Sequence, residues 1–159
     1  WAEDRLLPDV MRAVAAGEPV VVRSPEATRP WQHVLEPLGG YLLLAQSLSE
    51  NPLHISQAFN FGPLLEANRS VRQLLEAVFQ YWPGEWVDRS DPDEPHEAGR
   101  LHLQIDSAYH QLGWRPCWNF HTTVERSVNW YRRVAQGQNP LNCCLEDLKA
   151  YQEVMTCGR

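Results

Sequence analysis

The stretch that decides the fold is Arg29-Pro-Trp-Gln-His-Val-Leu-Glu-Pro37, which runs directly into Leu38-Gly-Gly-Tyr-Leu-Leu-Leu-Ala-Gln46. The apolar spacing of the second run predicts a helix over residues 34–48. The Pro-bearing loop before it, residues 24–30, brings Arg29 close to the start of this helix. A guanidinium in that place has five donors in a planar fork, which can bind two oxygens of an anionic group at once.

Composition restricts the class of protein. With 159 residues, 43% of them apolar, the chain is long and apolar enough for one domain with its own core. The formal net charge of −6 argues against a nucleic-acid-binding surface, which is typically basic. The longest apolar run, Tyr41 to Ala45, is too short to span a bilayer. The chain opens Trp1-Ala-Glu-Asp-Arg5, with neither an initiator Met nor a signal sequence, so we expect part of a longer, cytoplasmic protein.

Hydrophobic periodicity and turn signals predict an α/β order of elements. Apolar residues at helical spacing predict a first helix that Gly17 ends, and Ser70 is placed to cap a later helix. The sequence has no Gly-rich phosphate loop, and its mixed order fits a lobe that packs on the end of a doubly wound sheet. The predicted helices are 5–16, 34–48, 71–81, 106–112, 124–131 (capped by Thr122 or Thr123) and 145–155; the predicted strands are 19–22, 57–61, 86–87 and 101–103; the predicted loops are 24–30 and 88–99.

Arg29 is the first candidate for a binding residue, and the residues alone leave two roles open. One is a surface arginine that stacks on Trp31 or pairs with Glu26 or Glu36, and the pattern by itself favours this role. The other is a contact to a diphosphate, because a planar fork suits two phosphate oxygens better than an ammonium does.

The other candidates depend more on context. His96 follows the acidic loop, where a histidine is more often inert than a ligand. Arg5 and Arg23 flank the first helix and the first strand, and only context distinguishes them from plain surface charges. The histidines and cysteines lack the spacing of metal ligands, and no Gly-x-Ser-x-Gly elbow is present. We therefore expect neither a metal site nor an acyl-transfer nucleophile.

Taken together, several segments resemble one family, the CDP-glucose 4,6-dehydratases of the extended short-chain dehydrogenase/reductase group. The combination of Arg-Pro-Trp-Gln-His-Val with His-Glu-Ala is the most specific part, since Arg-x-Trp and Leu-Gly-Trp occur in many nucleotide-sugar enzymes. The segments that carry the resemblance are Trp1-Ala-Glu-Asp-Arg-Leu-Leu-Pro-Asp9, Pro19-Val-Val-Val-Arg-Ser-Pro25, Arg29-Pro-Trp-Gln-His-Val34, Ala58-Phe-Asn-Phe-Gly-Pro63, Pro95-His-Glu-Ala98, Leu112-Gly-Trp-Arg-Pro116 and Val128-Asn-Trp-Tyr131.

The resemblance implies an α/β fold: the C-terminal, substrate-binding portion of an extended short-chain dehydrogenase (Rossmann-type) fold, without its dinucleotide-binding half. Residues 1–159 would form one region, family-like over 1–135 and ending in a helical tail over 136–159. The full enzyme would be a lyase that converts CDP-glucose into CDP-4-keto-6-deoxyglucose and water through hydride transfer by bound NAD. It would be a homodimer, formed mostly through helices outside this chain.

The catalytic groups of such enzymes are not in this sequence. Their Gly-rich NAD loop and Tyr-x-x-x-Lys pair have no counterpart here, because Lys149 is the only lysine and position 145 is Leu. We therefore expect no catalytic and no cofactor-binding residue in this chain. The family also usually has Asp and Lys at the positions of Gln104 and Ser107, so local charge there is not carried over.

Carried over residue by residue, the resemblance implies a set of substrate-binding positions. Arg29 would bind the diphosphate, with His96 as a second donor near it. Arg5 would lie along the nucleotide, and Arg23 would face the cytidine. Apolar or backbone contacts to the base would come from the first helix. The implied residues are Arg5, Leu6, Pro8, Arg23, Arg29 and His96.

Two other readings of the function stay open at this point. One keeps the fold but changes the reaction, to that of another nucleotide-sugar epimerase or dehydratase. The other is a non-catalytic module that binds a nucleotide or a protein partner.

Overall fold

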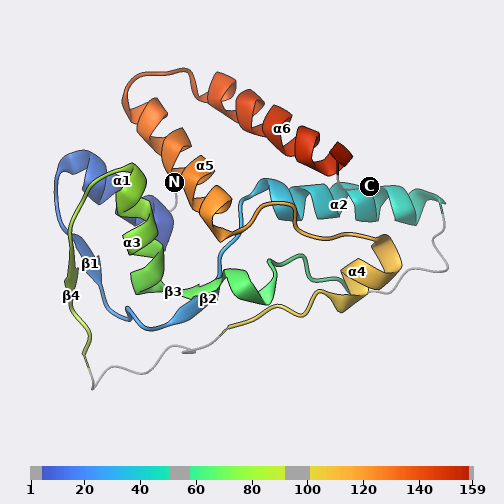
Figure 1. Cartoon of the computed structure of the whole chain (residues 1–159), viewed down its shortest axis with the longest axis horizontal. Coiled ribbons are helices and arrows are strands. Elements are labelled where there is room, and N and C mark those ends of the chain that lie inside the picture. The colour runs from blue at the N-terminus through green and yellow to red at the C-terminus, as the bar shows by residue number, and fades with distance from the viewer. Residues whose placement is uncertain (1–4, 51–57, 92–100, 158–159) are drawn as a thin grey trace.

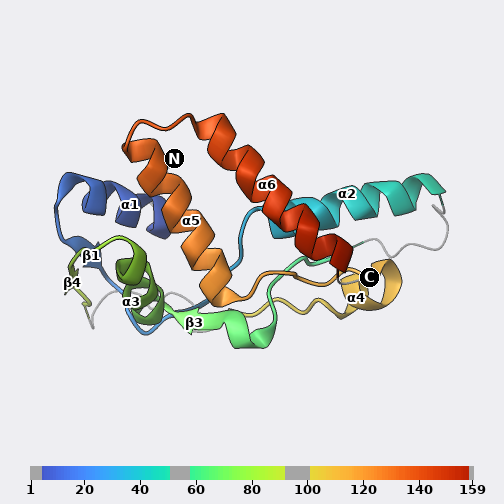
Figure 2. The same ribbon diagram turned by 45° about the horizontal axis from the view of Figure 1, so that its top comes forward.

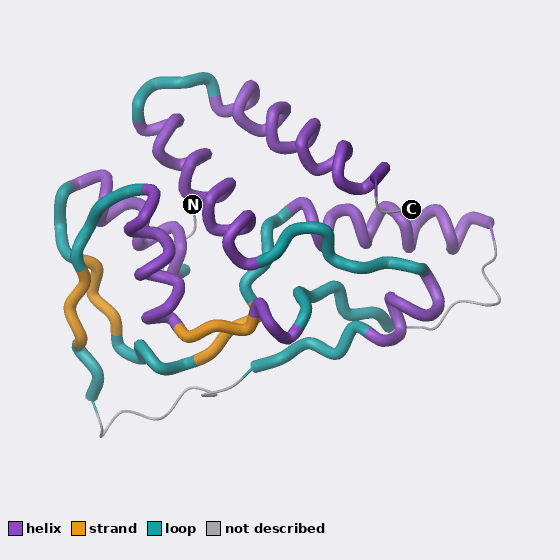
Figure 3. The backbone as a smooth tube through the Cα atoms, in the orientation of Figure 1, coloured by secondary structure: helices purple, strands orange, loops and turns teal. Residues whose placement is uncertain are grey.

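The computed structural model describes residues 5–50, 58–91 and 101–157. Helices dominate these ranges, and four short strands lie at one end of the molecule (Figures 1 and 3). The elements in chain order are α1 (Leu6–Ala16), β1 (Val20–Val22), β2 (Thr28–Pro30), α2 (Leu35–Glu50), the 3₁₀ helix η2 (Leu65–Ala67), β3 (Asn68–Ser70), α3 (Val71–Tyr81), β4 (Trp86–Asp88), α4 (Asp106–Leu112), α5 (Phe120–Ala135) and α6 (Pro140–Cys157).

The strands form two separate two-stranded sheets. β1 and β4 are parallel, with Val20 opposite Trp86. β2 and β3 are antiparallel, with Arg29 opposite Arg69. The second pair, which we call the β2–β3 ribbon, lies below α3 in the view of Figure 1 and leads directly into that helix.

The main core lies between α1, β1, α3 and α5. Val10, Leu75, Val78 and Val128 are completely buried there, since each comes from the apolar face of its helix. α3 begins with a capping box, in which the Ser70 hydroxyl accepts the backbone N–H of Gln73 and the Gln73 side chain accepts that of Ser70.

A smaller cluster lies at the other end of the molecule, where Phe61, Ala108 and Trp114 pack against α2. Phe61 approaches α2 so closely at Gly40 that a Cβ atom there would lie 2.3 Å from the ring. α6 then runs back alongside α5 and over the start of α2 (Figure 2). In this way α2 lies between the smaller cluster and α6.

The predicted helices are confirmed, with two corrections to their ends. α1, α2, α3 and α4 form where periodicity placed them, and Gly17 ends α1 in the left-handed conformation with φ 71°. α5 begins earlier than predicted, because Asn119 rather than Thr122 or Thr123 is the N-cap and its side chain accepts the Thr122 N–H at 2.9 Å. α6 begins at Pro140, five residues before the predicted start.

The strand predictions are only partly correct. β1 and β4 are confirmed, but residues 58–61 and 101–103 form no strand, and residue 57 lies outside the described residues. The predicted loop over 24–30 is also wrong at its end, because residues 28–30 pair with β3. In the predicted loop over 88–99, residue 88 ends β4, residues 89–91 have no regular structure, and the others lie outside the described residues.

Over the described ranges, no helix combines the length and the apolar composition that a membrane span needs.

Candidate functional site

Arg29 is the central residue of β2 and is half-buried. Its Nη1 donates to the carbonyl oxygen of Thr28 at 2.9 Å. The two carboxylates that the sequence offered as its surface partners bind elsewhere: Glu26 pairs with Arg72 at 2.7 Å, and Glu36 lies in the interior. Among the described residues, the contacts of these two carboxylates therefore go to partners other than Arg29.

Trp31, the third surface partner that we considered for Arg29, is held by the facing strand. Its indole Nε1 donates to the carbonyl oxygen of Arg69 at 2.8 Å. The side chain also packs against the main core. The aromatic residue after Arg29 therefore fixes β2 against β3.

The other predicted binding residues lie on α1 and β1. Arg5 is the N-cap of α1 and is exposed, with its carbonyl oxygen accepting the Asp9 N–H at 3.0 Å. Leu6 packs against the main core, and Pro8 is half-buried in the first turn. Arg23 is exposed and follows the last residue of β1.

Two of the predicted arginines, Arg23 and Arg29, therefore lie on one continuous segment of the chain, which leads from β1 into β2. β1 and β2 follow each other along the same edge of the molecule, with Arg23 after the first strand and Arg29 in the second (Figure 1). α1 contacts β1 from the side. His96 lies outside the described residues.

A buried carboxylate, that of Glu36, lies at the start of α2. From the sequence it was considered only as a surface partner of Arg29, and its own hydrogen-bonded site was missed. Glu36 is 0% exposed and accepts three hydrogen bonds. The backbone N–H of Cys117 donates at 2.9 Å, that of Trp118 at 2.7 Å, and the Tyr151 hydroxyl at 2.8 Å. Burial raises the pKa of Glu36, although these three hydrogen bonds oppose that shift.

The Glu36 carboxylate joins three parts of the chain that are far apart in sequence. It fastens α2 to the segment before α5 and to α6. Burial, followed by the nearby Glu36 charge, also raises the pKa of the Tyr151 hydroxyl. The donors lie 81 to 115 residues away, so no local pattern around Glu36 could have revealed this arrangement.

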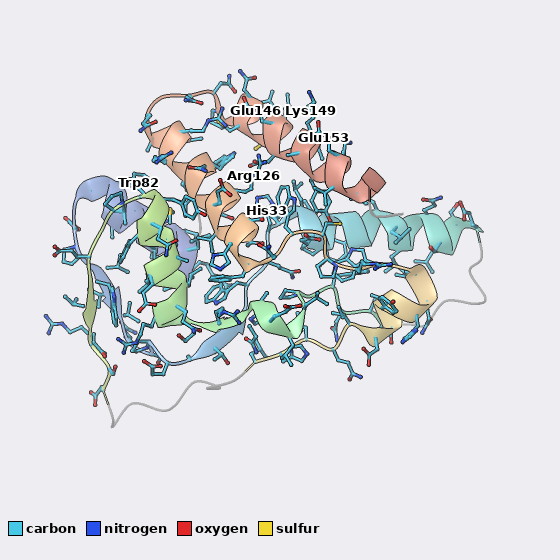
Figure 4. The ribbon with its side chains drawn as sticks, viewed as in Figure 1. His33, Trp82, Arg126, Glu146, Lys149 and Glu153 are labelled. Carbon is cyan, nitrogen blue, oxygen red and sulfur yellow. The ribbon has the colours of Figure 1, made fainter. Side chains whose placement is uncertain are left out.

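His33 lies next to this carboxylate centre and is 7% exposed. Its Nδ1 accepts the Leu35 N–H at 3.3 Å, and its ring meets Trp118 edge-on, with centroids 4.8 Å apart. Arg126 covers the same indole at 5.6 Å and pairs with Asp147 at 3.4 Å. Figure 4 labels Arg126, on α5, close to His33. Burial, and then the charge of Arg126, lower the pKa of His33 to about 4, so the imidazole is neutral at pH 7.

A cavity of about 380 Å³ lies against this group. His33 and Asp147 give it polar atoms, while Trp130 and Tyr131 supply aromatic walls. Within the described residues no group of three or more His, Cys, Asp or Glu side chains is close enough to hold a metal ion. The group therefore contains one neutral imidazole, that of His33, and one carboxylate paired with an arginine, that of Asp147. Their contacts hold the surrounding elements in position.

Comparison with known proteins agrees with the resemblance in the sequence. No protein-family model matches the chain. The CDP-glucose 4,6-dehydratase of Salmonella typhimurium is 36% identical over 158 residues, which is 98% of this chain and 44% of that protein. The chain therefore spans less than half the length of this relative.

Solved structures extend the comparison to the fold. The UDP-glucose 4-epimerase of Stenotrophomonas maltophila, solved with NAD and formylated UDP-arabinopyranose, superposes with a TM-score of 0.70 at 20% identity, over 85% of this chain and 41% of that one. The dTDP-glucose 4,6-dehydratase of Bacillus anthracis, solved with NAD, gives a TM-score of 0.64 at 15% identity, over 82% and 39%.

The chain has the fold of the C-terminal part of an extended short-chain dehydrogenase/reductase. The predicted fold class is confirmed, as is the resemblance to CDP-glucose 4,6-dehydratase. In this fold β2 and β3 pair although they are far apart in the sequence: the facing residues Arg29 and Arg69 are separated by 40 positions. Sequence reasoning missed this pairing because Pro30 in β2 and Asn68 in β3 have low strand propensity.

Proposed function

We propose that this chain is the nucleotide-sugar-binding part of a CDP-glucose 4,6-dehydratase. The observation that carries the proposal is the 36% identity over 98% of the chain, which includes the Arg-Pro-Trp-Gln-His-Val stretch. Arg29 lies half-buried at the centre of β2 in the β2–β3 ribbon, and a planar guanidinium there suits the role of a diphosphate contact. Arg5, Leu6, Pro8, Arg23 and His96 are proposed to complete the nucleotide-sugar site.

The whole enzyme would be a lyase that releases water from CDP-glucose. NAD would supply the hydride acceptor there, and the residues that the structure describes do not fit it. In the described ranges the glycines with positive φ, Gly17, Gly113 and Gly137, each follow the end of a helix, whereas a dinucleotide loop needs glycines between a strand and a helix start. We therefore assign substrate contacts but no cofactor contact to this chain.

Binding of nucleotides to the isolated chain tests the substrate class. We expect CDP and CDP-glucose to bind more tightly than UDP or UDP-glucose in calorimetric titrations. Tighter binding of UDP-glucose would favour an epimerase or another dehydratase, the alternative that the fold alone also permits. Absence of binding by any of these nucleotides, in a chain that is folded and monomeric, would contradict the proposal.

A chimera tests the reaction. In it, this chain replaces the corresponding part of the Salmonella enzyme, and we expect conversion of CDP-glucose. Arg29→Ala in the chimera should raise KM for CDP-glucose by about tenfold, the effect of losing one charge-assisted contact. Arg133→Ala is the control, since this arginine pairs with Glu146 at the far end of α5. Unchanged KM and kcat in the Arg29 variant would refute its assignment.

A further inference from the structure

The helix α2 lies at the surface but has almost no charged residues. Glu36 is buried and Glu50 is its last residue, and residues 37–49 between them include no Asp, Glu, Lys or Arg. In Figures 1 and 2 the second half of this helix projects past the end of α6. A surface helix normally has charged residues on its outer face, whereas a helix that is apolar all round is buried. α2 therefore has the composition of a core helix, in a place where the described residues leave one face open.

The open face of α2 is apolar and continuous. On the inner side of the helix, Gly39 makes room for the Tyr151 hydroxyl and Gly40 for the Phe61 ring. On the other side, exposed apolar residues follow each other at helical spacing, and Leu42 among them is 74% exposed. These residues are Leu38, Tyr41, Leu42, Ala45 and Leu48. A contiguous apolar patch of this kind indicates a contact surface for another protein or domain.

An unpaired segment of the backbone lies along the same helix. Residues 58–61 alternate between exposed and more buried positions, which is the pattern of a strand. No backbone N–H of residues 58–62 donates to the backbone oxygen of a described residue. Phe61 packs on α2 at Gly40, and its ring meets that of Tyr41 edge-on, with centroids 5.5 Å apart. The segment and the apolar side chains are therefore neighbours, and we call residues 38–48 and 58–62 together the α2 face.

The α2 face has the parts of an α–β unit without its sheet. A helix that packs on the strand following it is the repeating unit of a sheet covered by helices. The two sheets in the described ranges pair β1 with β4 and β2 with β3, so neither takes up residues 58–62. This chain also spans less than half the length of its Salmonella relative and of the epimerase with the same fold. The dinucleotide-binding half of such enzymes is built on a doubly wound sheet.

We propose that the α2 face is the surface on which the dinucleotide-binding half of the enzyme packs, and that residues 58–62 add a strand to the edge of its sheet. This inference rests on the proposed function for the class of enzyme, but not for the base or the sugar that it binds. Strand addition supplies main-chain hydrogen bonds to the unpaired segment. The apolar side chains of α2 then cover the same sheet, which explains why this helix carries no outer charges.

Hydrogen–deuterium exchange tests the strand addition, in the isolated chain and in the chimera with the Salmonella enzyme. We expect the amides of residues 58–62 to exchange about tenfold or more slowly in the chimera, because ladder hydrogen bonds protect them there. The amides of Leu75 and Val78 in the main core are the internal reference and should be protected in both proteins. Fast exchange of residues 58–62 in a chimera that is active, or equally slow exchange in the isolated chain, would overturn the inference.

Leu42→Glu tests the apolar part of the α2 face. In the isolated chain this side chain is exposed, so we expect the midpoint of thermal unfolding to change by less than about 1 °C. In the chimera the glutamate would be buried without a partner, and the midpoint should fall by about 4 °C or more. Leu141→Glu is the matched control, since Leu141 is 64% exposed in the first turn of α6 and should affect neither protein. An equal fall in both proteins, or no fall in the chimera, contradicts the proposal.

The outcomes separate this inference from the proposed function. If the chimera converts CDP-glucose without protection of residues 58–62, the proposed function stands and the inference is overturned. If these residues are protected in a chimera that acts on another nucleotide sugar but not on CDP-glucose, the docking surface stands and the CDP-glucose assignment fails. If the isolated chain is a dimer that already protects residues 58–62, a second copy occupies the α2 face and the inference is overturned.

Discussion

Removal of the Glu36 carboxylate should destabilise the protein more than most single substitutions. Glu36→Ala leaves the N–H groups of Cys117 and Trp118 and the Tyr151 hydroxyl without their acceptor. A buried donor that loses its partner costs about 1–3 kcal/mol, so three of them give a loss of about 3–9 kcal/mol. A whole domain is stable by only about 5–15 kcal/mol, so a large part of its stability depends on this one side chain.

Urea unfolding followed by circular dichroism at pH 7 measures this loss. Glu36→Gln should cost less, about 1–3 kcal/mol, because the amide oxygen still accepts and a buried charge is removed. Glu50→Gln at the other end of α2 is the matched control, since Glu50 is exposed and accepts a hydrogen bond from the Gln46 side chain on the same helix. A loss below 1 kcal/mol for Glu36→Ala, or equal losses for Glu36→Ala and Glu50→Gln, would refute this reasoning.

Three further substitutions test other parts of the structure. Gly40→Ala should lower the free energy of unfolding by about 1–3 kcal/mol, because its Cβ would lie 2.3 Å from the Phe61 ring; an unchanged urea midpoint would contradict this close approach. Folding lowers the pKa of the His33 imidazole from 6.5 to about 4. The folded protein therefore loses stability as the pH falls from 6.5 toward 4. The total loss is about 3 kcal/mol, at about 1.4 kcal/mol per pKa unit. His33→Asn should remove that part of the pH dependence in urea titrations at pH 7 and pH 4.5, and identical pH dependence in both proteins would count against it. Ser70→Ala should cost about 1 kcal/mol in thermal or urea unfolding through loss of the capping box with Gln73, and no measurable change would show that the cap does not stabilise α3.

Local patterns predicted the helices and failed for several strands. The helices have an apolar face and a cap or stop residue within a few positions, such as Ser70 before α3 and Gly113 after α4. Residues 58–61 also alternate in exposure, with Phe61 buried, but the described residues provide no strand for them to pair with. A strand needs a partner as well as a pattern, and a sequence shows only the pattern.

The residues of the candidate site also fall into two groups: those that a local pattern reveals, and those whose partners are distant in the sequence. Arg29 was found from its position before an apolar helix and from a family motif. Its place opposite Arg69 was not found, because the register joins residues 40 positions apart. Glu36 was visible only as a charge near Arg29, because its three donors belong to the other half of the chain.

The position of Glu36 also sets an order of events during synthesis. Tyr151 follows it by 115 residues, which a ribosome adds in about 6–23 s at about 5–20 residues per second. Until then α2 lacks the last donor to its buried charge and keeps its apolar side chains uncovered, among them those that α6 later approaches. Contacts of such long range form late and slow the folding of a chain. The hydrogen bonds of Glu36 are therefore complete only once the final helix has been made, and the start of α2 depends on the last part of the chain for its final contact.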